Sequence, residues 1–150
     1  MNEDFIDLLQ SLLTEEARFL VVGAYAMAAH GVPRATGDID IWVAADEGNA
    51  GRVFRALARF GAPLSSLGIS VVDFTAPDSV VQIGLPPRRI DVLTAISGVA
   101  FEAAWDRRET YPFSGLSVPV LGRGDLIANK RAAGRPKDLA DVATLDAKTK

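Results

Sequence analysis

The stretch FLVVGAYAMAAHGVPRATGDIDIWV, residues 19–43, joins two short apolar segments through a run of small residues and a loop. The first segment predicts a strand at 18–23. Ala and Met are strong helix formers and glycine commonly ends helices, so residues 24–31 predict a short helix that stops at Gly31. The second segment, DIDIWV at 38–43, alternates with a period of two, which is typical of a strand. A strand–helix–strand unit therefore stands near the start of the chain.

The rest of the chain adds helices and strands on both sides of this unit. Apolar residues at helical spacing predict helices, and period-two alternation between turn residues predicts strands. The ranges are helices at 3–13, 48–63, 101–109, 123–134 and 136–146, and strands at 80–84, 89–96 and 116–122. Pro119 indicates an edge position for the last strand, because proline donates no ladder hydrogen bond. This order predicts a single domain over residues 1–150, in the α/β or α+β class.

The composition excludes several classes of protein. The chain has 150 residues, of which 49% are hydrophobic and 23% charged, as in ordinary globular proteins. It has no cysteine, so disulfides and thiolate metal sites are excluded. The net charge of −3 provides no general attraction for nucleic acid or anionic membranes. The start, MNEDF, lacks the basic residues of a signal peptide, and no apolar run is long enough to span a bilayer. We therefore expect a cytoplasmic protein without a membrane partner.

Two aspartates stand inside the second strand, although Asp is a poor strand former and a buried carboxylate is costly. The alternation places Asp38 and Asp40 on one face, about 6–7 Å apart along the backbone. A third aspartate, Asp91, lies in RIDVL, another alternating strand. If the two strands are neighbours about 5 Å apart, the three carboxylates meet. A divalent cation would relieve their repulsion, and an all-oxygen ligand set suits Mg²⁺ or Mn²⁺.

A structural interpretation of the same aspartates is also open. Arg34, Arg88 or Arg89 could pair with them as surface salt bridges, which is the usual explanation of a lone D-x-D motif. The third aspartate, together with the turn described next, favours the metal.

The junction between the first strand and the short helix has the features of a phosphate site. The first amide N–H groups of a helix are unpaired and lie at the positive end of its dipole. The small residues Gly23 and Ala24 would let a phosphate approach the backbone closely. Asp38 follows only 15 residues after Gly23, on what is expected to be the adjacent strand. A nucleoside triphosphate carrying Mg²⁺ would contact both groups.

These motifs, in this order, resemble the polymerase-β-like nucleotidyltransferase superfamily. The resemblance rests on the Gly-Ala turn, on HGVPRATGDIDI at 30–41 and on RIDVL at 89–93. Residues 83–108 and 125–145 resemble more narrowly the abortive-infection (AbiEii-like) type of small bacterial nucleotidyltransferases. The resemblance implies a minimal nucleotidyltransferase fold, with a central mixed β-sheet flanked by helices and with C-terminal helices.

The resemblance also assigns roles to residues of this chain. Gly23 and Ala24 match the phosphate-binding turn of the superfamily. Asp38 and Asp40 match its metal-binding pair, and Asp91 matches its third carboxylate. In that superfamily the third carboxylate helps to bind metal and can take the proton from the attacking hydroxyl.

Further residues are expected around the nucleotide. The segment NKRAAGRPKD matches one in which a lysine and a downstream aspartate face the nucleotide, here Lys130 and Asp138. Lys130 is then expected to offset charge on the leaving pyrophosphate. Arg34 and Thr36 precede the carboxylates and could contact phosphate or base, or be solvated loop residues. Arg135 could bind phosphate or serve only as the entry to the last helix.

Two features depart from the superfamily pattern. Residue 24 is Ala, where many active members have Ser or Gly, so a hydroxyl is missing from the phosphate site. Larger active members also carry an added helical domain that this chain lacks.

Several functions are compatible with these observations. The resemblance implies Mg²⁺-dependent transfer of NMP from an NTP such as ATP to a hydroxyl of tRNA, a protein or a small molecule. Such enzymes often form the toxin of a toxin–antitoxin pair, which implies an antitoxin partner. Alternatively, as Ala24 suggests, the chain is a catalytically inactive homologue that binds a nucleotide or a protein partner. A haloacid-dehalogenase-type phosphatase, with its own D-x-D, fits poorly because IDIWVAAD continues the strand where a flexible turn is required.

Overall fold

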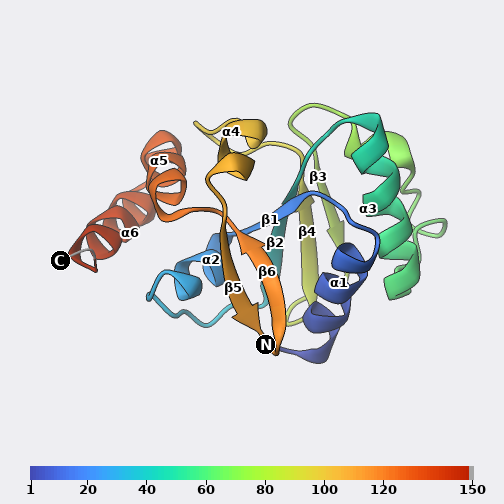
Figure 1. Cartoon of the computed structure of the whole chain (residues 1–150), viewed down its shortest axis with the longest axis horizontal. Helices are drawn as coiled ribbons and strands as arrows, with labels where there is room; N and C mark the ends of the chain where they lie inside the picture. Colours follow the sequence, from blue (N-terminus) through green and yellow to red (C-terminus); the bar gives the residue numbers. More distant parts are fainter. Residues whose placement is uncertain (149–150) are drawn as a thin grey trace.

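The computed structural model describes residues 1–148, which fold around a six-stranded mixed β-sheet (Figure 1). The strands are β1 (Phe19–Val22), β2 (Asp38–Val43), β3 (Val80–Ile83), β4 (Arg89–Leu93), β5 (Glu109–Phe113) and β6 (Leu116–Val120). The helices are α1 (Glu3–Thr14), α2 (Gly23–Ala29), α3 (Glu47–Phe60), α4 (Phe101–Asp106), α5 (Arg123–Ala133) and α6 (Pro136–Ala147), with a short 3₁₀ helix η1 (Val71–Phe74).

The strand order in the sheet is β3-β4-β2-β1-β6-β5. The two central strands, β1 and β2, run antiparallel, although a short helix and a loop connect them. β2 pairs in parallel with β4, and β1 in parallel with β6. The outer strands β3 and β5 complete antiparallel hairpins with β4 and β6. This mixed α/β architecture confirms the predicted fold class, and it places the two aspartate-bearing strands next to each other.

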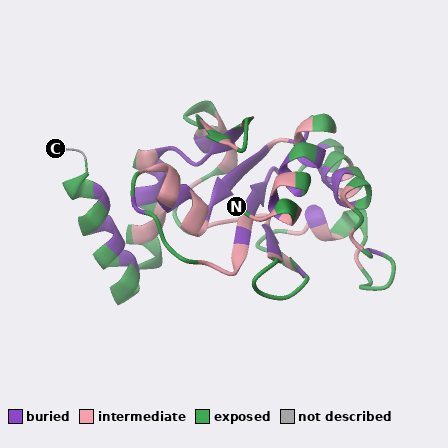
Figure 2. Ribbon diagram, turned by 90° about the horizontal axis from the view of Figure 1, so that it is seen from below, coloured by how far each residue is buried: buried purple, intermediate pink, exposed green. Residues whose placement is uncertain are grey.

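The hydrophobic core includes residues of the sheet and of all six α-helices, and α1 and α3 pack together in Figure 1. Phe5 and Leu8 of α1, Trp42 of β2 and Leu57 of α3 are almost completely buried. Burying a side chain of this size contributes about 1.5–3 kcal/mol. Figure 2 shows the same distribution, with buried residues on the strands and exposed residues on the outer helix faces. The core therefore holds β2 through Ile39 and through the buried residues 41–43, while Asp38 and Asp40 remain partly exposed.

Two sequence predictions on the β6 side of the sheet were wrong. The helix predicted at 101–109 ends at Asp106, and its last predicted residue, Glu109, begins the strand β5, which was not predicted. β6 is also not an edge strand, despite Pro119, because it lies between β1 and β5. The ladder between β6 and β1 is confined to the pair Val21–Val120, so a missing N–H at Pro119 costs little there. The true edge is β5, which contains Pro112, a residue that edge strands tolerate.

The C-terminal helices α5 and α6 form a pair beside α2 (Figure 1). Gly134 ends α5 in the left-handed conformation, and Pro136 opens α6 two residues later. The buried side of α6 includes two acids, Asp138 and Asp141, besides Val142 and Leu145. None of the helices at residues 1–148 is long and apolar enough to cross a membrane.

Candidate active site

The three predicted carboxylates meet at the centre of the sheet. Asp40 of β2 is directly opposite Asp91 of β4 in the parallel ladder, and Asp38 precedes Asp40 by two residues on the same face. One carboxylate oxygen from each of the three lies within 4.8 Å of the others. Asp91 is buried, at 7% exposed, whereas Asp38 and Asp40 are partly exposed. The strand pairing assumed from the sequence is therefore confirmed, and it forms an acidic cluster of residues 38, 40 and 91.

Gly23 is tied to this cluster by close contact. It follows β1, whose last residue Val22 pairs with Asp40. The φ angle of Gly23 is +68°, and a Cβ built there would lie 2.1 Å from Asp40 Oδ2. No other residue type could fit without moving the Asp40 carboxylate. The glycine is required by the aspartate as well as by any phosphate, which the sequence did not reveal.

The environment of the cluster disfavours three negative charges. Burial raises the pKa of Asp40 to about 7, and the nearby charges of Asp38 and Asp91 add to the effect. Thr36 donates a hydrogen bond of 2.8 Å to Asp38 Oδ1, which orients that carboxylate. A carboxyl group that retains a proton near neutral pH indicates a site short of positive charge.

One arginine compensates part of this charge. Arg89 Nη2 lies 2.5 Å from Asp38 Oδ2, and Arg89 Nε lies 3.1 Å from Asp91 Oδ1. The salt-bridge interpretation is thus confirmed for Arg89. Arg88 instead pairs with Asp4, on the far side of the strand, and belongs to the surface.

The acidic cluster fits a divalent cation. Its oxygen-only donor set is the kind that Mg²⁺ or Mn²⁺ prefers. Among residues 1–148, the buried Asp91 Oδ1 makes no hydrogen bond, because its contact with Arg89 Nε is an ion pair of poor hydrogen-bond geometry. Buried oxygens rarely lack a partner, so this atom has capacity for a ligand.

Cations from the C-terminal helices and the 31–37 loop lie across from the cluster. Lys130 Nζ on α5 lies 2.9 Å from Asp141 Oδ2 and 3.7 Å from Asp138 Oδ1. Arg34 lies 2.5 Å from Asp141 Oδ1, and Arg135 lies 2.6 Å from Asp138 Oδ2. Asp138, which was expected to face the nucleotide, lines the larger cavity with a side chain that is only 1% exposed and is paired with Arg135 and Lys130.

Asp141 was missed by the sequence reasoning. Its side chain is 4% exposed and holds Arg34 and Lys130 at once. The available signal was its spacing of three from Asp138, which places both acids on one face of a helix. Two acids on the inward face of a helix are unusual enough to have indicated buried partners.

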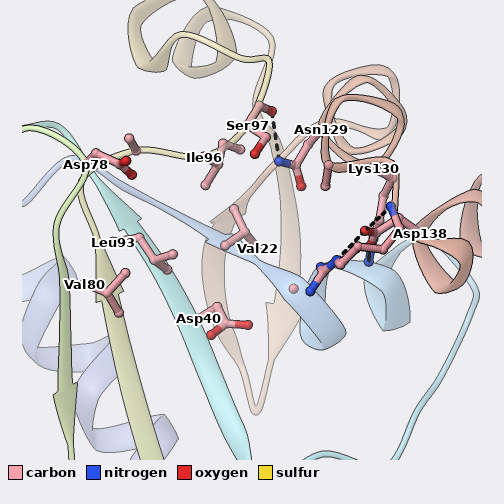
Figure 3. A pocket seen from close by; sticks show the side chains of 14 residues that line it. Val22, Asp40, Asp78, Val80, Leu93, Ile96, Ser97, Asn129, Lys130 and Asp138 are labelled. Atoms are coloured by element: carbon pink, nitrogen blue, oxygen red, sulfur yellow. Dashed lines mark hydrogen bonds and ion pairs between the residues drawn. The ribbon is translucent and has the colours of Figure 1, made fainter.

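Two cavities open beside the cluster and share Gly23, Asp40, Lys130 and Arg135. The larger, of about 600 Å³, extends over β3, β4 and α5, and Figure 3 shows Asp40 and Val22 facing Lys130, Asn129 and Asp138 across it. The smaller, of about 310 Å³, extends along α2 and the loop before β2.

The cavities bring the predicted residues together. Every residue predicted to bind the nucleotide lines one cavity or the other: Gly23, Ala24, Arg34, Thr36, Lys130, Arg135 and Asp138. Four cations line the smaller cavity: Arg34, Lys130, Arg135 and Lys137. Carboxylates on one side and cations on the other form a site suited to a polyphosphate that carries a metal.

Comparison with solved structures agrees with this geometry. The chain is similar to a protein of Thermotoga maritima that is provisionally assigned as a nucleotidyltransferase, with a TM-score of 0.58 and 19% identity over 95% of this chain and 88% of that one. It is also similar to the lincosamide antibiotic adenylyltransferase LnuA, solved with lincomycin bound, with a TM-score of 0.60 and 11% identity over 99% and 98% of the two chains. No protein-family model and no curated protein matches the sequence. The chain has a nucleotidyltransferase fold.

Proposed function

We propose that the chain is a divalent-metal-dependent nucleotidyltransferase, which acts as one domain and moves NMP from an NTP to a hydroxyl group. The observation that carries this proposal is the acidic cluster, whose carboxylate oxygens lie within 4.8 Å of one another beside a cavity lined by four cations. Asp38, Asp40 and Asp91 would hold Mg²⁺ or Mn²⁺. A bound ion would stabilise the charge that develops on the transferred phosphate.

The chain's own residues would bind and orient the substrates. Lys130, Arg34 and Arg135 would contact the triphosphate, with the amide N–H groups of Gly23 and Ala24 on its other side. Asp91 would accept the proton of the attacking hydroxyl, the role that the resemblance assigns to the third carboxylate. Such preorganised charges commonly lower transition-state energies by several kcal/mol.

We propose a small molecule as the acceptor. The larger cavity has the volume of a drug-sized ligand site, and Val22, Val80, Leu93 and Ile96 give it an apolar floor. Three basic residues that could contribute to a tRNA-binding surface already have partners: Arg107 pairs with Asp125, Arg131 with Asp146, and Arg108 with the ring of Trp105. LnuA, which shares the fold, was solved with a small molecule bound.

The narrower resemblance to abortive-infection nucleotidyltransferases supports a role in a toxin–antitoxin pair. We propose that the chain acts in the cytoplasm, where NTP and Mg²⁺ are supplied, and that an antitoxin partner restrains it. Co-purification of a tagged chain with the product of a neighbouring gene would test the partner.

The proposed activity is tested by transfer of label from [α-³²P]NTP, with Mg²⁺ or Mn²⁺, to separate pools of small metabolites, tRNA and protein. Asp40→Asn should reduce the rate by about a hundredfold or more, as loss of a key electrostatic group usually does. Asp7→Asn, the same change at an exposed position of α1, should leave the rate unchanged. Equal labelling by the wild type and Asp40→Asn would reject the assignment.

A catalytically inactive nucleotide-binding protein is the second candidate. Ala24 lines the smaller cavity and offers no hydroxyl to a phosphate. Titration calorimetry with Mg-ATP and Mg-GTP would show binding in that case, while no acceptor pool became labelled.

A further inference from the structure

The side chain of Arg89 lies against the acidic cluster and is only partly exposed. Its Nη2 atom donates to Asp38 Oδ2 at 2.5 Å and to Asp91 Oδ2 at 3.2 Å. Its Nε atom lies 3.1 Å from Asp91 Oδ1, and the side chain is 31% exposed. The guanidinium therefore bridges two of the three carboxylates that would hold a metal.

The strand register fixes this bridge. Arg89 is opposite Asp38 in the parallel ladder of β2 and β4, and Asp91 is opposite Asp40. Because side chains alternate along a strand, Arg89 and Asp91 are on the same face. The guanidinium cannot leave the neighbourhood of the cluster without a change of rotamer.

A cation in this position has two possible effects on a metal. It could orient Asp38 and Asp91 and so strengthen metal binding, or it could neutralise them and so weaken it. Arginine is permanently charged, and the interaction of charges at such distances is strong in a partly buried site. It also donates hydrogen bonds to Asp38 Oδ2 and Asp91 Oδ2, so a metal would have to compete with the guanidinium for these two carboxylates. Both the positive charge of Arg89 and its hydrogen bonds to the carboxylates favour weaker binding of a metal.

We propose that Arg89 is an internal counter-ion, which neutralises Asp38 and Asp91 in the metal-free protein and lowers the affinity of the cluster for a divalent cation. The inference rests on the proposed function, since it takes the cluster as a metal site. A metal that binds to the cluster would then displace the Arg89 guanidinium. In the metal-free protein the same guanidinium neutralises the carboxylates, so the fold remains stable without a metal.

The test is a calorimetric titration with Mn²⁺ alone, without nucleotide. Arg89→Gln should bind Mn²⁺ about tenfold more tightly than the wild type, as expected when a nearby like charge is removed. Arg88→Gln is the matched control, because it makes the same charge change one residue away, where the arginine pairs with Asp4 at 3.1 Å. It should bind Mn²⁺ like the wild type. Arg89→Lys, which retains the charge, should remain close to the wild type.

A second measurement detects loss of folding. In EDTA, Arg89→Gln should melt below the wild type, because three carboxylates then lack their cation, and Mn²⁺ should raise its Tm by more than it raises that of the wild type. Circular dichroism before titration would show that both proteins are folded.

The outcomes distinguish a failure of the counter-ion role of Arg89 from a failure of the proposed metal site. If the wild type binds Mn²⁺, Asp40→Asn does not, and Arg89→Gln binds no more tightly than the wild type, the counter-ion role is wrong and the metal site stands. If neither the wild type nor Arg89→Gln binds Mn²⁺, the metal site and the counter-ion role both fail.

Discussion

Gly23 is required for two reasons, the turn between β1 and α2 and the space for the Asp40 carboxylate. Its positive φ turns the chain from β1 into α2, and its lack of a Cβ leaves room for the Asp40 carboxylate. An L-residue in this conformation is strained, and a side chain here would collide with a proposed metal ligand. The acidic cluster depends on this glycine for its geometry.

Gly23→Ala should therefore both destabilise the protein and impair the site. The left-handed conformation alone costs about 1–2 kcal/mol. The overlap with Asp40 Oδ2, at 2.1 Å, should add about 1–3 kcal/mol, as overpacking commonly does. Gly68→Ala is the control, because its φ is +70° and open space surrounds its Cβ position. Chemical denaturation measures both, and equal losses of stability would contradict the contact with Asp40.

At the scale of elements, α6 supplies the carboxylates that position the cations lining the site. Its inward face presents Asp138 and Asp141 to Arg135, Lys130 and Arg34, which come from three different segments. Burial alone would raise the pKa of Asp141, but hydrogen bonds from Lys130 and Arg34 lower it below its usual range. The helix thus holds the proposed phosphate-binding cations in place at the wall of the two cavities.

Asp141→Asn should release Lys130 and Arg34 and weaken the binding of Mg-ATP. The loss of charged hydrogen bonds should lower the free energy of unfolding at pH 7 by about 2 kcal/mol. A carboxylate with a lowered pKa contributes stability above its unfolded pKa and loses it as the pH falls through its folded pKa. The stability difference between wild type and variant should therefore narrow below about pH 4.

Asp146→Asn provides the control for this prediction, since Asp146 lies on the same helix, is 50% exposed and is 3.6 Å from Arg131. Exposed pairs of this kind contribute about 0–1 kcal/mol. Urea denaturation at several pH values distinguishes the two variants. A difference for Asp141→Asn that stays constant down to pH 3 would show that its carboxylate is not held by the two cations.

At the scale of the whole molecule, the strand order creates the site. Asp40 and Asp91 are far apart in sequence and become direct neighbours only because β4 pairs in parallel with β2. Ile39 and Ile41, on the face of β2 opposite the aspartates, are completely buried, and Trp42, on the aspartates' own face, is buried against Phe101. The packing of these neighbours fixes the position of both aspartates. The acidic cluster is therefore coupled to global folding.

Metal binding should accordingly stabilise the entire fold. A ligand that binds only the folded state raises the free energy of unfolding by about 2.7 kcal/mol at a hundred times its Kd. We expect Mg²⁺ or Mn²⁺ to raise the Tm of the wild type in a concentration-dependent manner, as measured by calorimetry. Asp40→Asn should show no such rise, and an identical rise in that variant would place the bound ion elsewhere.

The sequence by itself determined the local elements and the chemistry that they carry. Period-two alternation at DIDIWV and RIDVL predicted the strands and the shared faces of their aspartates, because side-chain direction follows directly from residue order in a strand. The position of Gly23 and Ala24 at the junction between the first strand and the short helix was also predicted, because these residues are adjacent in the sequence. β5 was missed, because Pro112 argues against a strand until the position at the sheet edge is known.

Only the tertiary structure decided which charges meet. That Arg89 and not Arg34 joins the acidic cluster, and that Asp141 holds Arg34 and Lys130, depends on strand register and on how α6 docks. The reason is physical: a long charged side chain can reach many partners, and its choice depends on burial and distance in three dimensions. The sequence names these groups, and the folded sheet and helices bring them together.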